Sequence, residues 1–445
     1  MPSAAEQLAS NFNFSAFSKA TELKQRILFT MLALIVARLG TYIPMPGIDA
    51  SSLAQQIQQQ QGGLLDVFNL LAGGAIERMA IFALGIMPYI SSSIIMQLMT
   101  TVSPTLEQLK KEGEAGRKQI NQYTRYGTVM LAAVQAYAIA IGLEQWGTVV
   151  IQPGFAFRMS TVITLTGGTI LLMWLGEQIT ARGVGNGISL IIMAGIVARI
   201  PTFLVQVFEQ ARTGAINPTL IVGMFILFGG LIGFVVFMER AQRRLLVQYP
   251  KRQQGNRVFG GESSHLPLKI NVAGVIPPIF ASSLLLLPTT VANFNAANIP
   301  GWLQNIIVLL GQGQPLFILL YSAGIIFFCF FYTAIVFNPE ETADNLKKYG
   351  GFIPGIRPGK RTADYIDYVL TRITVVGALY LTFVCLIPEL IGGAYGVQTF
   401  AFGGTSLLIV VSVTMDTVAQ IQSHLIAQQY EGLIKKSRLK GARPK

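Results

Sequence analysis

The sequence predicts an all-α polytopic membrane protein with ten transmembrane helices, and three observations lead to this fold class. Hydrophobic residues make up 52% of the 445 residues and charged residues only 12%, about half the charged share usual in soluble domains. The apolar residues gather in continuous runs, whereas the strands of a membrane β-barrel alternate over about ten residues. Positive charge is concentrated in every second connection between the runs, which is typical of a membrane topology.

Each apolar run is close to the length of a membrane span, because a helix needs about 20 mostly apolar residues to cross the hydrocarbon core. Residues 1–26 lack the pattern of a cleavable signal peptide, so we expect the first run to be kept as a span. Exposed backbone groups are costly in lipid, which favours helices. The ten runs lie near residues 27–43, 79–102, 126–143, 159–179, 184–204, 217–238, 270–290, 315–337, 373–391 and 400–421.

The distribution of basic residues predicts the orientation. With ten spans, 28 of the 33 Lys and Arg residues fall on one side. Because cytoplasmic loops carry the excess of Lys and Arg, we expect the tails 1–26 and 422–445 in the cytoplasm. The connections 239–269 and 338–372 lie on the same side and are long for simple connectors. Attraction to anionic lipids explains part of the net charge, and the long basic loops also indicate a docking surface for a soluble polyanionic partner.

Two pairs of short matches divide the ten runs into two halves of five. Residues 86–90 in the second run resemble residues 276–279 in the seventh, with proline flanked by isoleucine. Residues 187–192 in the fifth run resemble residues 404–409 in the tenth. Because five is odd, the second copy enters the membrane from the opposite side. This is an inverted repeat, which in transport proteins places the working path between the halves.

A short segment at about 62–75 precedes the second span. Glycine pairs lie at both of its ends, and the apolar stretch 64–71 between them is far too short to cross the membrane. Two interpretations stay open from these residues: an interfacial helix lying on the membrane, or a re-entrant plug that moves on glycine hinges.

Motifs of catalysis, of metal binding and of cofactor binding are missing from the sequence. Cys329 and Cys385 lie in apolar runs without spacing that suits a metal site or a disulfide. There is no Walker loop, no G-x-S-x-G and no H-E-x-x-H. Charges within the spans are few, Arg38 and Asp416 being the clearest, whereas ion-coupled carriers usually hold several. We therefore expect no enzymatic activity, no cofactor and no metal.

Seven short motifs follow one another along the chain. They are residues 81–90 (IFALGIMPYI), 111–114 (KEGE), 122–127 (QYTRYG), 182–189 (RGVGNGIS), 265–269 (HLPLK), 351–359 (GFIPGIRPG) and 403–406 (GGTS). In this order they resemble the SecY family, the central subunits of the bacterial Sec protein translocase. The resemblance implies an hourglass-shaped channel between a first half at 27–204 and a second half at 205–421. It also implies that the channel passes unfolded secretory polypeptides.

The resemblance also assigns the parts of the pore. A ring of isoleucines is expected to seal the resting channel, since branched apolar side chains dewet a constriction and deform around a passing chain. The ring comprises Ile86, Ile90, Ile188, Ile192, Ile279 and Ile409. The plug beneath it comprises Leu64, Leu65, Asp66, Val67, Phe68, Asn69, Leu70 and Leu71. The lateral gate between spans two and seven, which releases hydrophobic segments into lipid, includes Ser91, Ser283 and Leu287.

Prolines in the gate spans are expected to weaken helix hydrogen bonds and to help these helices move. These are Pro88, Pro277 and Pro278.

The resemblance assigns partners to the basic loops. They would receive a translating ribosome, whose RNA is a polyanion, or the SecA motor ATPase, and Arg357 is expected to couple the channel to that motor. The SecE and SecG subunits, secretory preproteins, signal sequences and anionic lipids complete the expected partners, in the bacterial cytoplasmic (inner) membrane. The docking residues are Arg243, Arg244, Lys251, Arg252, Arg257 and Arg357.

Two alternative functions compete with the channel. A secondary carrier for a small solute fits ten spans and an inverted repeat, but it does not need an apolar constriction or large basic loops. A membrane-embedded enzyme would need a set of convergent catalytic residues, which the sequence does not offer.

Overall fold

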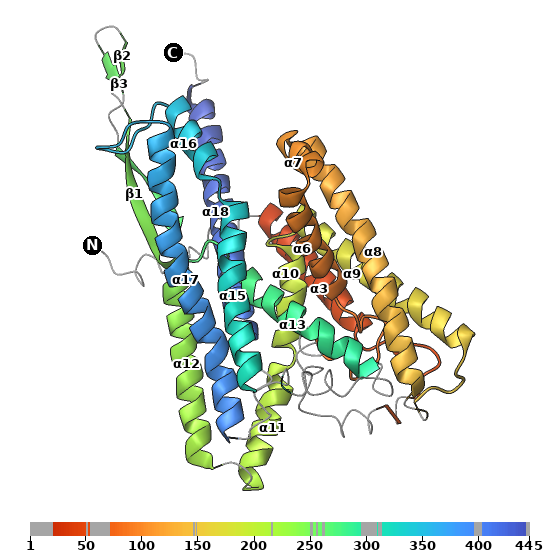
Figure 1. Ribbon diagram of the computed structural model, residues 1–445. Coiled ribbons are helices and arrows are strands. Elements are labelled where there is room, and N and C mark those ends of the chain that lie inside the picture. Colours follow the sequence, from red (N-terminus) through yellow and green to blue (C-terminus); the bar gives the residue numbers. More distant parts are fainter. Residues whose placement is uncertain are drawn as a thin grey trace.

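The computed structural model gives a helical protein with a small amount of β-structure (Figure 1). The description that follows covers residues 21–49, 52–53, 72–145, 147, 149–214, 217–249, 252–254, 257–259, 263–294, 309, 314–395 and 403–441.

Most helices of the described region overlap a predicted span. They are α3 (Thr21–Gly40), α6 (Met87–Val102), α7 (Pro104–Lys111), α8 (Glu114–Gln145), α9 (Phe155–Arg182), α10 (Gly187–Val197), α11 (Ile200–Arg212), α12 (Pro218–Arg240), α13 (Ile276–Phe294), α15 (Pro315–Val336), α16 (Pro339–Lys348), α17 (Lys360–Tyr395) and α18 (Gly404–Gly441). The strands are β1 (Gln242–Gln248), β2 (Arg252–Gln254), β3 (Arg257–Phe259) and β4 (Ser263–Lys269), paired β1 with β4 and β2 with β3, antiparallel.

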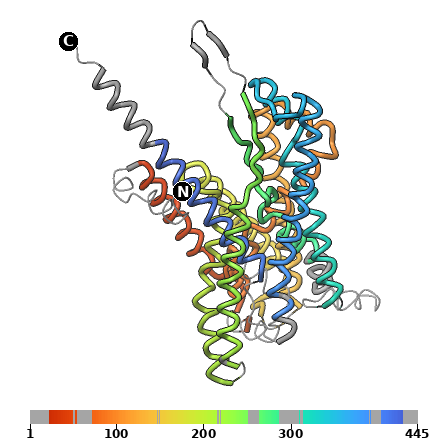
Figure 2. Tube along the Cα trace, turned by 90° about the vertical axis from the view of Figure 1, so that its left-hand side faces the viewer, coloured from red at the N-terminus to blue at the C-terminus, as the bar shows by residue number. Residues whose placement is uncertain are grey.

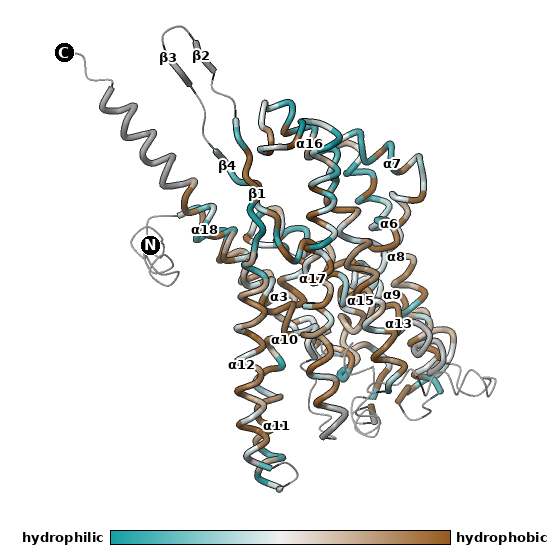
Figure 3. The backbone as a smooth tube through the Cα atoms, turned by 60° about the vertical axis from the view of Figure 1, so that its left-hand side comes forward, coloured by the Kyte–Doolittle hydropathy of each residue, from teal (hydrophilic) through white to brown (hydrophobic). Residues whose placement is uncertain are grey.

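Within these ranges, seven helical segments are long and apolar enough to cross a membrane, and residues Ile276–Leu285 of α13 form a shorter apolar helix. The helices α3 and α6 coincide with predicted spans without reaching that combination of length and hydropathy. The polytopic all-α fold is therefore established, whereas the count of ten spans stays a prediction. Figure 3 shows hydrophilic residues gathered at the end of the molecule that carries α7, α16 and β1. We call this end the hairpin end.

The helices form two groups with separate cores (Figure 1). One core joins α12, α13, α15, α17 and α18, and a second joins α8 and α9 with the segments around Met45 and Met79. A third cluster combines α3, α9 and α10 of the first group with α13 and α18 of the second. The groups meet where α10 packs on α18 and where α6 and α8 pack on α13. At the end opposite the hairpin end, α11 and α12 lie side by side (Figure 2).

The second and seventh spans begin later than hydropathy predicted. Residues 79–86 form turns, apart from an isolated β-bridge of Ala80 with Pro44, and α6 begins only at Met87 with Pro88 in its first turn. In α13, Pro277 and Pro278 are the second and third residues. The expectation that these prolines weaken helices from within is therefore wrong. A first-turn residue has no intrahelical acceptor for its N–H, so proline is well tolerated there and marks where the helix starts.

Two glycines open helices at matching places in the two groups. A Cβ on Gly187, at the start of α10, would collide with the Gly176 carbonyl oxygen in α9. A Cβ on Gly404, at the start of α18, would collide with the Val384 carbonyl oxygen in α17. In each group, the last helix thus starts directly against the backbone of the preceding span, which only glycine permits. This shared packing supports the predicted inverted repeat.

Replacing Gly404 by alanine is expected to lower the free energy of unfolding by about 1–3 kcal/mol, because the added methyl overpacks a rigid backbone contact. The matched control is Gly403→Ala, since a Cβ at Gly403 meets no atom within 4 Å. Thermal unfolding of the purified chain in detergent measures both. Melting temperatures that agree between the two variants would contradict the close approach.

Candidate functional site: an apolar constriction and a basic docking unit

The six predicted ring isoleucines belong to a single apolar cluster between the two helix groups. Ile86, Ile192, Ile279 and Ile409 are buried within it, Ile409 being only 1% exposed, and Ile90 and Ile188 are half-buried and pack against it. The structure thus brings all six predicted residues together, from four different helical segments.

Each ring residue lies near the start of its helix. Ile86 directly precedes α6, Ile188 is the second residue of α10, Ile279 the fourth of α13 and Ile409 the sixth of α18. Asn186 caps α10 by accepting hydrogen bonds from the backbone N–H of Ile188 and Ser189. The first turn of α10, which carries Ile188, is therefore fixed by local hydrogen bonds as well as by packing.

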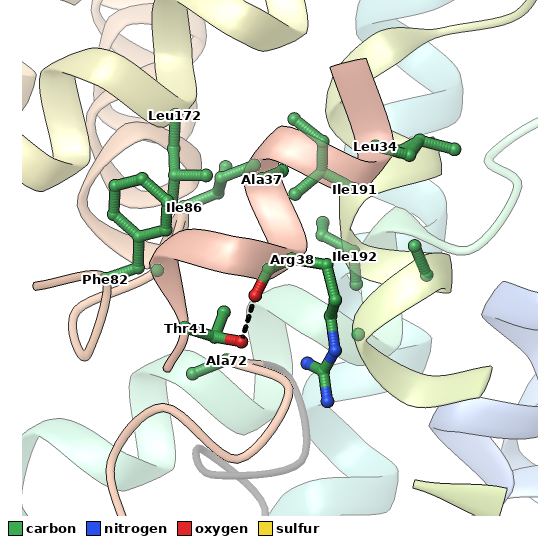
Figure 4. A pocket seen from close by; sticks show the side chains of 13 residues that line it. Leu34, Ala37, Arg38, Thr41, Ala72, Phe82, Ile86, Leu172, Ile191 and Ile192 are labelled. Carbon is green, nitrogen blue, oxygen red and sulfur yellow. Dashed lines mark hydrogen bonds between the residues drawn. The ribbon is translucent and has the colours of Figure 1, made fainter. Parts of the chain in front are cut away.

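Two small adjoining cavities border the cluster. The smaller, of about 10 Å³, is lined by Ile86, Ile90, Ile192 and Ile279 among others. The larger, of about 40 Å³, extends from Ile86 and Ile192 toward Arg38 (Figure 4). A water molecule needs about 10–15 Å³ of such volume. The smaller cavity therefore has room for about one water and the larger for about three, so the space found beside the isoleucines is narrow.

Two polar contacts lie at Gly73 and Gly74, which directly follow Ala72, a residue that lines the larger cavity. Arg38 Nη1 donates to the Gly73 carbonyl oxygen at 2.5 Å, and the Arg199 guanidinium pairs with the Glu77 carboxylate at 2.5 Å. Gly73 and Gly74 have φ of +67° and +83°, which glycine adopts without strain. The guanidinium of Arg38, within a predicted span, is thus hydrogen-bonded within the protein. The predicted plug, Leu64 to Leu71, lies outside the described residues.

The predicted gate residues lie on α6 and α13, which contact each other. Ser91 is half-buried on α6. The Ser283 hydroxyl on α13 is buried without a hydrogen-bond partner in the described region. Leu287 lies on α13, but its side chain is outside the description. The neighbouring Ser92, which the sequence did not single out, donates its hydroxyl to the Thr124 carbonyl oxygen at 2.7 Å and thereby ties α6 to α8.

The two long basic connections fold into one unit, which we call the docking unit: β1, β4, α16, residues 351–359 and the start of α17. Its small core consists of Leu245, Leu268, Ile353 and Ile366, all buried. Reciprocal backbone hydrogen bonds of 2.8 and 2.9 Å between Gln248 and Phe352 join the hairpin to the second connection. Loops distant in sequence are therefore held as one surface.

Exposed arginines lie on this unit. Arg243 and Arg244 are exposed on β1, and Arg357 is exposed on a turn between Gly355 and Gly359, which have φ of +83° and +105°. The Thr362 hydroxyl donates to the Arg357 carbonyl oxygen at 2.9 Å and fixes the turn. Of the other predicted docking residues, Lys251 lies outside the described residues, and Arg252 and Arg257 are described only as parts of β2 and β3.

Comparison with known proteins decides the family. The family model for SecY matches residues 80–418 of this chain. The chain belongs to the SecY family. The protein translocase subunit SecY of Escherichia coli K12 is 57% identical over 424 residues, which cover 94% of this chain and 96% of that protein.

Solved structures share the SecY fold. One described as that of a protein-conducting channel matches with a TM-score of 0.66 at 19% identity, over 90% of this chain and 92% of that one. Sec61 in a canine ribosome-channel complex from the endoplasmic reticulum matches with a TM-score of 0.62 at 18% identity, over 90% and 92% of the two chains. At these identities the structures establish the fold alone.

SecY membership confirms the predicted family and function class: the chain is a channel subunit of a protein translocase, a multi-pass membrane protein, and not an enzyme. The small-solute carrier and the membrane enzyme are set aside on this ground.

Sequence reasoning missed several polar contacts of this SecY-family chain. The Arg199–Glu77 ion pair joins residues 122 positions apart, and the Asn271–Glu239 hydrogen bond joins the two ends of the β-hairpin. Neither pair has a characteristic spacing. The one available signal was the presence of isolated polar residues at the ends of apolar runs.

Proposed function

We propose that this chain forms the translocation pore of a bacterial protein translocase and that the six isoleucines make its resting seal. The convergence of Ile86, Ile90, Ile188, Ile192, Ile279 and Ile409 in one buried cluster between the two helix groups carries this proposal. Dewetting of such a constriction blocks ions, whereas its branched side chains move apart around a polypeptide.

The seam between α6 and α13 is proposed as the lateral gate. Ser91, Ser283 and Leu287 lie along the two helices that form it. A hydrophobic segment in the pore leaves through this seam because its own transfer into lipid is favourable, by about 25 cal/mol per Å² of apolar surface. Residues 62–75 are proposed as the plug beneath the seal.

The docking unit is proposed to bind the SecA motor ATPase and the translating ribosome. Exposed Arg243, Arg244 and Arg357 give it a positive surface, which suits ribosomal RNA and acidic protein faces, and we assign Lys251, Arg252 and Arg257 to the same surface. A related channel is described in complex with the ribosome. The SecE and SecG subunits, signal sequences, preproteins and anionic lipids are the remaining proposed partners.

The hairpin end is proposed to face the cytoplasm of a bacterium, across its inner membrane. With ten spans, the basic residues place both termini on this side. The chain then divides into the tail 1–26, the halves 27–204 and 205–421, and the tail 422–445.

Reconstitution tests the proposal. Vesicles holding the chain with SecE and SecG receive SecA, ATP and a secretory preprotein, and protection of the preprotein from external protease is measured. ATP-dependent protection is expected. Vesicles that contain correctly inserted chain, fail to protect the preprotein and take up a small solute would contradict the proposal.

A further inference from the structure

A buried polar cluster lies inside the second helix group, at the base of the β-hairpin. It consists of the hydrogen-bonded pair Glu239 and Asn271, which we call the polar clasp, and of the Tyr380 and Ser412 hydroxyls, which lie near the Glu239 carboxyl. Asn271 and Tyr380 are each 4% exposed and Ser412 is 7% exposed. Glu239 is half-buried, on the last turn of α12. Four separate elements, α12, the segment before α13, α17 and α18, thus supply one polar group each to an otherwise apolar interior.

One side-chain amide holds the clasp together. Asn271 Nδ2 donates to Glu239 Oε1 at 2.7 Å and to the Gly274 carbonyl oxygen at 3.1 Å. An amide nitrogen has two hydrogens, so both bonds form at once. The bond to Glu239 is charge-assisted when that carboxyl is ionised, and such bonds are the stronger class. Asn271 therefore links the end of α12 to the residues that lead into α13.

The clasp continues the hydrogen-bond ladder of the docking hairpin. The last register pair of β1 and β4 is Gln242 with Lys269. The next bond inward runs from the Ile270 backbone N–H to the Ala241 carbonyl oxygen, at 3.1 Å. The Glu239–Asn271 bond follows as the next link between the two chain segments. Movement of the hairpin stem therefore acts directly on Asn271.

The segment after Asn271 runs straight into the constriction. Gly274 has φ of +64° and is followed by α13, which begins at Ile276 with two prolines in its first turn. Ile279, the fourth residue of α13, is buried in the isoleucine cluster. The prolines fix φ at two successive residues. We expect the stiff proline pair to carry a displacement of Asn271 and Gly274 to Ile279.

The surroundings of the clasp favour a switchable arrangement. A Cβ on Gly377 of α17 would lie 2.8 Å from the Ile270 carbonyl oxygen, so the segment before α13 rests directly on α17. The Tyr380 and Ser412 hydroxyls and Asn271 Oδ1 are buried without a hydrogen-bond partner in the part of the chain that the structure describes. Buried polar atoms without partners destabilise the arrangement that contains them, which lowers the cost of moving to another one.

We propose that the polar clasp couples the docking unit to the constriction. The clasp holds α13 in its resting position, and it shifts α13 when a partner binds the hairpin of β1 and β4. The inference deepens the proposed function and rests on it. Glu239 and Asn271 are positioning residues, since neither belongs to the isoleucine cluster. The mechanism is a mechanical link of hydrogen bonds and stiff backbone from β1 and β4 to Ile279.

The experiment separates coupling from docking. Spin labels on Ile95→Cys of α6 and Leu284→Cys of α13, both exposed positions, report the α6–α13 distance in vesicles of the complete complex. Purified bacterial ribosomes are the probe. In the otherwise unsubstituted chain, ribosomes are expected to shift this distance. Asn271→Leu and Glu239→Leu are expected to keep ribosome binding and to abolish the shift.

Conservative variants provide the matched controls. Glu239→Gln keeps an acceptor oxygen for Asn271 Nδ2 and is expected to retain the shift. Ser412→Ala and Tyr380→Phe remove hydroxyls that have no partner in the described region, so they are also expected to retain it. A full shift in Asn271→Leu would overturn the coupling. The coupling would also be overturned if Ser412→Ala and Tyr380→Phe lost as much of the distance shift as Asn271→Leu. Any disturbance of the site would then be enough to abolish the shift, whichever contact was removed.

A second measurement does not depend on whether the variants fold. In the unsubstituted complex, ribosome binding is expected to change hydrogen exchange of residues 270–276. Unchanged exchange there, while the α6–α13 distance shifts, would overturn the clasp and leave the proposed function intact. A complex that neither binds ribosomes nor protects preprotein would instead overturn the proposed function.

Discussion

Replacing Ile90 and Ile409 together by glycine is expected to raise the resting ion conductance of reconstituted vesicles on the order of tenfold or more. Both side chains lie in the isoleucine cluster, Ile409 fully buried and Ile90 packed at its edge. The two cavities beside the cluster have room for about one and about three waters. Removing two branched side chains merges such spaces into a path that water can fill, and a hydrated path conducts ions.

The matched control for this experiment is glycine at exposed positions of the same two helices, outside the isoleucine cluster. Ile95 on α6 and Ile426 on α18 are 48% and 53% exposed. Glycine there costs the helices the same propensity, about 1 kcal/mol per residue, but opens no space in the cluster. Ion flux is measured with a fluorescent dye in vesicles without ribosomes, motor or preprotein. A leak in the control double variant as large as that in Ile90→Gly/Ile409→Gly would mean that loosened helices, and not a lost seal, carry the ions.

The sequence was sufficient to predict the isoleucine cluster because two kinds of information agreed. The spacing of Ile188 and Ile192 puts both on one face of α10, and the motif resemblance said which positions of the other segments meet them. The structure brings these residues together with Ile279 and Ile409. Hydropathy alone cannot distinguish these isoleucines from the many that face lipid. Motif matching can, because it identifies each residue by its position in the chain.

The starts of the gate helices were predicted wrongly for a physical reason. Hydropathy measures how apolar a segment is, and residues 79–86 are as apolar as α6 itself. They nevertheless form turns that pack inside the protein, where their backbone groups find partners such as the Ile43 carbonyl oxygen for the Ile81 N–H. Pro88 was the local sign that a helix begins, because proline suits a first turn far better than a helix interior.

The polar clasp and the small core of the docking unit could not be predicted because they depend on tertiary contacts. Asn271 is one polar residue beside an apolar run, and nothing in its neighbourhood points to Glu239, 32 positions earlier. Likewise, the charges of the two basic connections showed that they face water, but not that Leu245 and Ile366 share a core. Such pairings follow from how the chain folds back on itself, which neither composition nor periodicity encodes.

Arg357→Glu is expected to reduce SecA-driven preprotein transport on the order of tenfold or more, because it reverses a charge at a site proposed to meet an acidic partner surface. Arg357 is exposed, and its turn is held by Gly355, Gly359 and the hydroxyl of Thr362. None of these contacts involves the guanidinium group. The substitution is therefore expected to leave membrane insertion and the melting temperature of the purified chain unchanged.

The matched control is Lys360→Glu, which makes the same change in net charge at another exposed position of the docking unit, three residues away. At the start of α17 a carboxylate is favourable for the helix, so this variant is expected to fold and transport normally. Arg357→Lys separates charge from geometry: recovery of transport would indicate that charge is sufficient, and continued loss would indicate that the planar guanidinium is needed. Equal transport by Arg357→Glu and Lys360→Glu would contradict a specific role for Arg357, because the loss would then follow the net charge of the docking unit and not one contact.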